Sequence, residues 1–107
     1  GVAEDRKRAF ELAEQGARLG CHHCQGVLAY CYLNGHGCEE DEARSLELAR
    51  ESSGRGSRYG QLTLGLLHCY GYRNGGFVQD YAQALVFYLL ALLGQLYSYK
   101  QSQDQLQ

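Results

Sequence analysis

The chain has 107 residues, of which 45% are hydrophobic, and this is enough for one domain with a buried core. Its net charge of −2 gives no electrostatic reason to expect nucleic acid or an anionic membrane as a partner. Five cysteines, an odd number, cannot all pair within the chain, which favours a reducing, intracellular compartment. The absence of proline leaves a succession of helices uninterrupted.

Three segments share one frame, in which a glycine is followed four residues later by an aspartate and then by an amphipathic run. The glycine–aspartate pairs are Gly1 and Asp5, Gly37 and Asp41, and Gly76 and Asp80. The aspartates are 36 and 39 residues apart, and a repeat of this length indicates a solenoid of stacked supersecondary units.

The first cycle predicts one helix over residues 3–16 and a second over residues 22–34. Asp5 lies near the start of the first helix, where a carboxylate caps free amides and favours the helix dipole. The inward face of the first helix is expected to carry Ala9, Leu12, Ala13 and Ala17. The core face of the second helix is expected to carry Cys24, Leu28, Cys31 and Tyr32.

The second cycle predicts a helix over residues 41–53, followed by another helix with a similar buried face. The inward residues of the first are expected to be Ser45, Leu48 and Ala49. The core positions of the next are expected to be Gly60, Leu64, Leu67 and His68. A loop at residues 71–76 is longer than its counterpart and accounts for the wider spacing before Asp80.

A last strong helix is predicted over residues 80–93, and its run from Ala84 to Leu93 is apolar nearly all round. This run has about half of the roughly 20 residues that a membrane span needs, so a buried helix is predicted and no membrane segment. Such a helix needs cover on more than one side, from further repeats, from the polar tail folding back, or from self-association through residues 84–93. Residues 95–107 are rich in Gln and Ser and are predicted to form a polar tail or a capping helix.

The small, apolar and glycine positions recur in register in both full cycles. In the first they are Leu28-Ala29, Tyr32, Gly35, Gly37, Cys38, Asp41, Arg44-Ser45 and Leu48-Ala49. In the second they are Leu64-Gly65, His68, Gly71, Gly76, Phe77, Asp80, Gln83-Ala84 and Phe87-Tyr88. A partial copy supplies Gly1-Val2, Asp5, Arg8-Ala9 and Leu12-Ala13. This pattern resembles the Sel-1-like repeat family, a branch of the tetratricopeptide-like helical-repeat superfamily, over residues 1–94.

The resemblance implies an all-α, right-handed α/α solenoid of about two and a half helix-pair units. The expected divisions are a partial unit 1–20, units 21–56 and 57–94, and a tail 95–107. The resemblance also implies an interaction scaffold that binds protein partners, with no catalytic activity and no cofactor. Each helix pair is too small to bury its apolar stripe alone, so neighbouring pairs must stack. Small residues are expected to allow close backbone approach, namely Ala9, Ala13, Ala29, Gly60, Gly65 and Ala84.

A stacked array has one concave wall, built from the same helix of each pair, and such walls take extended peptides or partner helices. A stripe next to the core positions, at steps of three and four residues, is expected to line this groove. Its predicted members are His23, Val27, Tyr30 and Asn34 in one unit and Tyr59, Thr63, Leu66 and Tyr70 in the next. Tyrosine offers large contact area with few rotatable bonds, which suits an interface; the alternative is that some of these tyrosines only cover the core.

One stretch, Cys21-His22-His23-Cys24, has the residue types of a metal or redox site, and it supports an alternative function. Zinc would need a second pair of ligands, and the candidates are Cys31, His36 and Cys38. Repeat register favours packing, because Cys24 occupies the position of Gly60 and Cys31 that of Leu67. A further alternative is that the repeats act only as a structural spacer.

Overall fold

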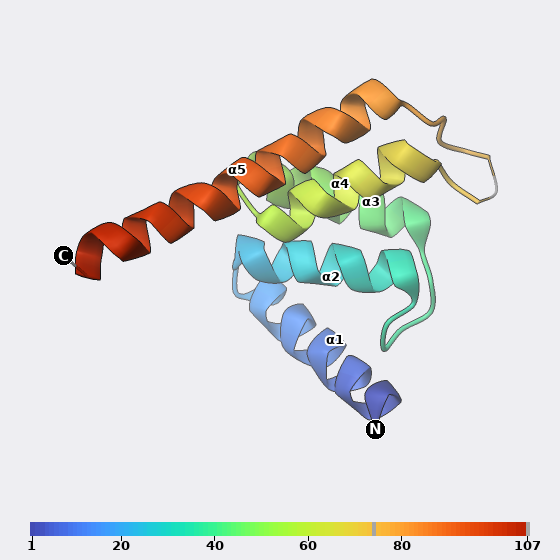
Figure 1. The fold of residues 1–107 in the computed structure, drawn as a ribbon. Coiled ribbons are helices and arrows are strands. Elements are labelled where there is room, and N and C mark those ends of the chain that lie inside the picture. The colour runs from blue at the N-terminus through green and yellow to red at the C-terminus, as the bar shows by residue number, and fades with distance from the viewer. Residues whose placement is uncertain (74, 107) are drawn as a thin grey trace.

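The computed structural model describes residues 1–73 and 75–106, and all regular structure within these ranges is helical (Figure 1). The five helices are α1 (Val2–Arg18), α2 (His22–Asn34), α3 (Glu42–Gly54), α4 (Arg58–Tyr70) and α5 (Tyr81–Leu106). The prediction of an all-α repeat array is thus confirmed, and α2 has the predicted bounds.

Two of the three repeated aspartates cap helices. Asp41 Oδ1 accepts a hydrogen bond from the Arg44 backbone N–H at 3.0 Å, and Asp80 Oδ1 accepts one from the Gln83 N–H at 3.1 Å. Each bond satisfies an amide that has no partner in the first turn of a helix. Asp5 instead lies within the first turn of α1, because that helix already begins at Val2.

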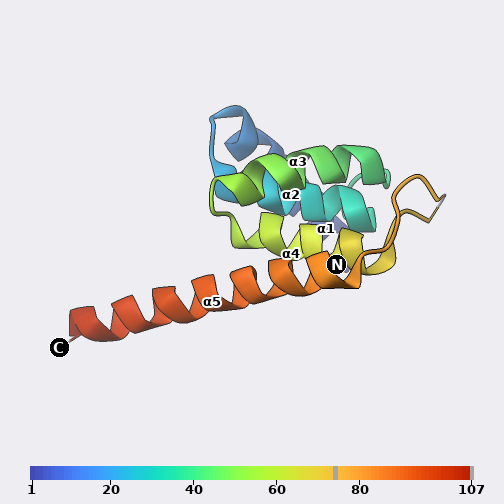
Figure 2. The ribbon, with the colours of Figure 1, turned by 90° about the horizontal axis from the view of Figure 1, so that it is seen from above.

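The helices form two layers, one of α2 and α4 and the other of α1, α3 and α5. The pairs in contact are α1–α2, α2–α3, α2–α4, α3–α4 and α4–α5. No such contact joins α1, α3 and α5 to one another within the described residues. Figure 2 shows α3 and α5 on opposite sides of α4. Of the two layers, only that of α2 and α4 has direct contacts between its own helices within the described residues, because α2 packs against α4.

The core lies where α2, α3 and α4 meet. Its buried cluster consists of Ala29, Leu46, Ala49, Leu64 and Leu67. The predicted core residues Leu28, Cys31 and Gly60 are buried as well. Ser45 is fully buried, and its Oγ donates a hydrogen bond to the Ala29 carbonyl oxygen at 2.7 Å, so the polar atom is satisfied.

In α1 the predicted inward face is partly wrong. Ala13 is buried, but Ala9 is exposed and Leu12 is 59% exposed. Phe10 makes the contact instead, with its ring edge-on to Tyr32 at 5.5 Å between centroids. The physical reason is that, among the helices that the structure describes, α1 packs against α2 alone, so only a narrow side of α1 is covered.

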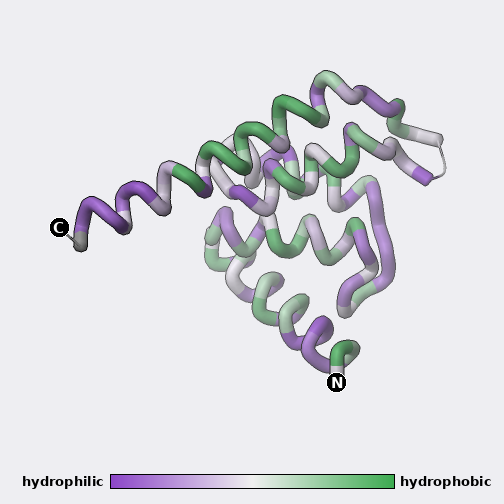
Figure 3. The backbone as a smooth tube through the Cα atoms, in the orientation of Figure 1, coloured by the Kyte–Doolittle hydropathy of each residue, from purple (hydrophilic) through white to green (hydrophobic). Residues whose placement is uncertain are grey.

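The C-terminal segment differs from the expectation most clearly. Gly20 and Gly56 have positive φ, 87° and 91°, and reverse the chain after α1 and α3. The same repeat position in α5 is Gln95, and the helix continues through it to Leu106 without folding back. Figure 3 shows the hydrophobic half of α5 beside the body and its hydrophilic half extending away.

The apolar run of α5 was predicted to be buried, and most of its large side chains are not. Leu85, Leu89 and Leu93 are 58%, 46% and 60% exposed, because α4 covers only one side of the helix. By length and composition the helix from Tyr81 to Gln105 could cross a membrane, and only 6% of its most apolar window is buried.

Candidate functional site

The surface formed by α2 and α4, here called the wall, is continuous across the two complete units. The rings of Tyr30 on α2 and Tyr59 on α4 meet edge-on at 6.1 Å between centroids, and Tyr30 also meets His36 at 5.7 Å. Edge-on contacts of this kind stabilise aromatic pairs beyond the area that they bury. The two predicted stripes are therefore joined into one surface.

Glycine allows the two wall helices to come this close. A Cβ atom on Gly26 would lie 2.7 Å from the Gly60 backbone nitrogen, which is closer than real Cβ contacts. Gly60 in turn packs against α3, where a Cβ would lie 2.7 Å from the Ser53 nitrogen. The prediction of close backbone approach at Gly60 is confirmed, whereas Gly26 was not foreseen.

One hollow of about 380 Å³ opens where α2 and α4 end. Three of the predicted wall residues, Asn34, Leu66 and Tyr70, line it together with Leu33, Glu40, Glu42, Gly71 and Arg73. Arg73 is held over its rim, with Nη1 3.2 Å from Glu40 Oε2. The Arg73 backbone N–H donates to both carboxylate oxygens of Glu42, at 3.1 and 3.2 Å.

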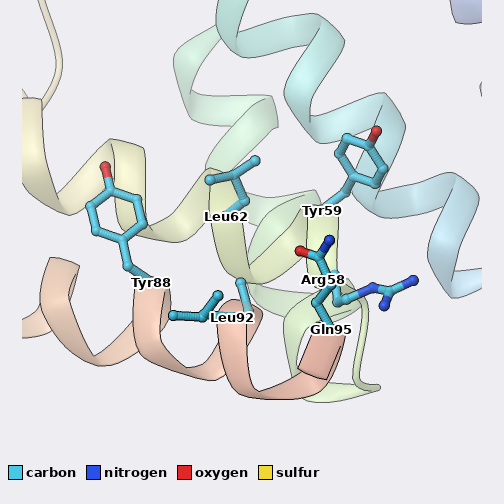
Figure 4. Close-up of a pocket in the computed structure, with 7 residues that line it drawn as sticks. Arg58, Tyr59, Leu62, Tyr88, Leu92 and Gln95 are labelled. Carbon is cyan, nitrogen blue, oxygen red and sulfur yellow. The ribbon is translucent and has the colours of Figure 1, made fainter. Parts of the chain in front are cut away.

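A second hollow of about 470 Å³ lies between α4 and α5, at the opposite end of the wall (Figure 4). From α4 it is lined by Arg58, Tyr59 and Leu62, and from α5 by Tyr88, Ala91, Leu92 and Gln95. Only Tyr59 belongs to the predicted set. The four residues of α5 were missed because that helix was expected to be buried, whereas Arg58 and Leu62 lie on α4 beside the predicted stripe.

Thr63 was predicted to line the groove, and the structure corrects this. Thr63 is fully buried, and its Oγ1 donates a hydrogen bond to the Tyr59 carbonyl oxygen at 2.7 Å. The side of α4 that carries Thr63 is buried, because α4 packs against α2, α3 and α5. Leu62, one residue earlier, faces the hollow in its place.

His23 and Val27, the remaining predicted wall residues, lie outside both hollows. His23 is exposed, and its ring lies at an angle of 39° to that of His22, with centroids 4.1 Å apart. Val27 is half-buried. The wall is thus best formed along α4, with Tyr30 and Asn34 contributing from α2.

Tyr88 anchors α5 to the wall. Its ring occupies the space beside Gly65, where a Cβ atom would lie 2.6 Å from two ring carbons. Burial, followed by the neighbouring Cys69, raises the pKa of Tyr88 to about 12. The phenol therefore stays neutral at physiological pH.

The Cys21-His22-His23-Cys24 stretch is explained mainly by packing. Cys24 fills the space beside Gly16 at the junction of α1 and α2, where a Cβ on that glycine would overlap the Cys24 sulfur. The backbone amide and thiol of Cys24 stabilise the Cys21 thiolate and lower the pKa of Cys21, while that contact raises the pKa of Cys24. All five cysteines lie in the described part of the chain and are free thiols.

The second set of proposed zinc ligands gives no convergent site. Cys31 is buried, and burial raises its pKa, while Cys38 Sγ donates a long hydrogen bond of 3.5 Å to the Cys31 carbonyl oxygen. Across residues 1–73 and 75–106, no three His, Cys, Asp or Glu side chains gather closely enough to hold a metal ion.

Comparison with known proteins identifies the repeats. The family model described as Sel1 repeat matches the chain three times, over residues 1–21, 22–57 and 58–95. These matches take in all of α1 to α4 and the first part of α5. No curated protein matches the chain.

Proposed function

The chain belongs to the Sel1 repeat family, and from this premise we propose that it is a non-catalytic adaptor whose α2–α4 wall binds a peptide or helix of a partner protein. Sel1 repeats are generally protein–protein interaction modules. The wall residues of this chain and the form of its ligand are the parts that we propose.

One observation carries the proposal. Asn34 comes from one repeat and Leu66 and Tyr70 from the next, and the three line a single hollow. A ligand in that hollow would contact consecutive units together, which is how a stacked array forms an extended binding surface. Tyr70 is 70% exposed, so a partner would bury most of this aromatic side chain.

The spacing along α4 sets the length of ligand that fits. Tyr59 and Tyr70 are eleven positions apart on the same side of the helix, which corresponds to about 16 Å at 1.5 Å per residue. An extended peptide of roughly five residues covers that distance. Its two ends would meet the two hollows, one rimmed by Arg58 and the other by Glu40, Glu42 and Arg73.

The test replaces both wall tyrosines. Peptides selected from a random-sequence display library against the wild-type protein are titrated by fluorescence anisotropy against wild type and against Tyr59→Ala/Tyr70→Ala. We expect the double variant to bind at least about 30-fold more weakly, because interface tyrosines each contribute on the order of 1–2 kcal/mol.

The matched control is Tyr81→Ala/Tyr97→Ala, which removes two equally exposed tyrosines outside the wall. This control should bind like wild type, and both variants should keep the wild-type circular dichroism and melting temperature. Unchanged affinity of the Tyr59→Ala/Tyr70→Ala variant would show that the peptides bind elsewhere and that the wall assignment is wrong.

A further inference from the structure

The exposed side of α5 carries an apolar seam with the spacing of a helix–helix contact. Leu85, Leu89, Leu92 and Leu96 follow one another at steps of four, three and four residues. This alternation places side chains in one line along a helix, as in pairs of helices that pack at a shallow angle. The four leucines are between 46% and 58% exposed.

The surroundings of the seam are unsuited to water. Val86, Leu90 and Leu93 flank it and are also about half exposed. From residue 81 to residue 99 the sequence has no Asp, Glu, Lys or Arg. An apolar band of this width marks a surface that another molecule covers.

The seam is not covered by a following helix in the manner that α4 covers α3. That arrangement requires the chain to reverse at the position of Gly20 and Gly56, and α5 has Gln95 there and runs straight on. Figures 1 and 2 show the C-terminal part of α5 extending past the other helices. Leu96 thus lies on the part of α5 that a second molecule can reach from several sides.

We propose that a second copy of this chain covers the seam, so that two molecules pair α5 against α5. The seven exposed residues of the seam and its flanks together offer on the order of 600 Å² per copy, so two copies would bury about 1,200 Å² in total, at the lower end of stable interfaces. A symmetric pair brings the same leucines together from both copies, so the seam is complementary to itself.

The packing of α5 on its own body favours this occupant over a lipid bilayer. Ala84 is only 3% exposed, and the Phe87 ring stacks on that of His68 at 5.5 Å with the planes nearly parallel. Tyr88 fills the space beside Gly65. Insertion of α5 across a membrane would break all three contacts, whereas pairing with a second copy leaves them in place.

The seam and the proposed peptide-binding surface meet at one residue, because Leu92 belongs to the seam and also lines the hollow between α4 and α5. Tyr59 and Tyr70 do not belong to the seam. The variants that test the pairing therefore leave Leu92, Tyr59 and Tyr70 unchanged.

The experiment measures molar mass by sedimentation equilibrium over a wide range of protein concentration. Wild type should shift from monomer to dimer as concentration rises. Leu89→Glu/Leu96→Glu should raise the dimer dissociation constant roughly 100-fold or more, because a charge would have to be buried at the seam. Glutamate is a good helix former, so α5 should keep its helicity by circular dichroism.

The control is Leu12→Glu, which places a single glutamate at a comparably exposed leucine on α1 and should leave the dimer intact. A second measurement needs no variant: amide hydrogen exchange within residues 85–99 should slow as the wild-type concentration is raised. Three results would each overturn the proposal: a wild type that stays monomeric, a dimer that survives Leu89→Glu/Leu96→Glu, or binding to phosphatidylcholine vesicles in preference to self-association.

Discussion

Three glycines determine how closely the helices approach, and each faces a different neighbour. Gly26 brings α2 against the backbone of α4, Gly60 brings α4 against the backbone of α3, and Gly65 makes room for the ring of Tyr88. In the preceding unit the positions of Gly65 and Tyr88 are held by Ala29 and Ala49, both fully buried. The equivalent positions between helices are thus occupied by two alanines in one unit and by a glycine and a tyrosine in the next.

Replacing Gly26 with Ala should destabilise the protein by about 1–3 kcal/mol, because the new Cβ meets backbone that cannot move without shifting a helix. The measurement is urea unfolding followed by circular dichroism. The control is Gly54→Ala, at a helical position with no neighbouring atom within 4 Å, and it should be neutral or stabilising by up to about 1 kcal/mol. Equal effects of the two substitutions would contradict the close-approach argument.

At this scale the sequence predicts some side chains and not others. Leu28, Leu64 and Leu67 are identified as core by their spacing, because a large apolar residue on a repeated stripe has few other places to go. Thr63 and Leu62 show the limit. Steps of three and of four residues both keep a stripe near one side of a helix, so the spacing alone fits either Leu62 or Thr63. The positions of α2 and α5 decide that Thr63 is covered and that Leu62 lines the hollow.

The helices α2 and α4 begin at equivalent repeat positions, so the residues that precede them can be compared directly. Ser57 caps α4: it is fully buried, and its Oγ accepts a hydrogen bond from the Gly60 N–H at 3.1 Å. One repeat earlier, Cys21 holds the cap position of α2, where its sulfur is a weaker acceptor than the Ser57 hydroxyl.

Ser57→Ala should therefore lower the free energy of unfolding by about 1–2 kcal/mol, because a buried amide loses its partner. Cys21→Ser, which installs the same cap on α2, should raise it by up to about 1 kcal/mol. Chemical denaturation of both variants beside wild type measures the difference in sign. If Ser57→Ala proves neutral, the cap contributes nothing to the stability of α4.

The end of α5 could not be predicted from composition. Gln and Ser are common in loops, and a polar stretch after an apolar run indicates a tail. A helix nevertheless continues until a residue such as glycine or proline stops it, and between Gly94 and Leu106 the chain offers neither. At the repeat position where Gly20 and Gly56 reverse the chain, α5 has Gln95. The absence of a glycine there was the sequence signal that the helix would continue.

For the molecule as a whole, the order of helix contacts predicts how far the destabilising effect of a substitution extends. In a stacked array each unit is stabilised by its neighbours, so central positions affect more of the structure than terminal ones. Leu67 lies in the central cluster and is 1% exposed, whereas Phe10 joins α1 to α2 at one end.

Leu67→Ala should destabilise the entire array by about 2–5 kcal/mol. Phe10→Ala should increase amide exchange in α1 and leave exchange in α3 and α4 unchanged. Segment-resolved hydrogen exchange by mass spectrometry distinguishes the two patterns. Loss of protection throughout the chain in Phe10→Ala would show that α1 is integral to one cooperative unit.

The fold as a whole could be predicted from the sequence, because each repeat carries its own copy of the same caps and core positions. The aspartate caps at Asp41 and Asp80 and the leucines at 28 and 64 occur in the same register, so each supports the other. The candidate site had no such support. Its hollows depend on Arg58, Leu62 and Leu92, which differ from their counterparts in the other units and follow from where α5 lies.

The lack of direct contact among α1, α3 and α5, within the residues that the structure describes, gives the array a mechanical property. The outer helices are held through α2 and α4 alone: α1 packs on α2, α3 on both, and α5 on α4. A change in the curvature of the array would therefore be resisted by these contacts and not by contacts among the outer helices themselves.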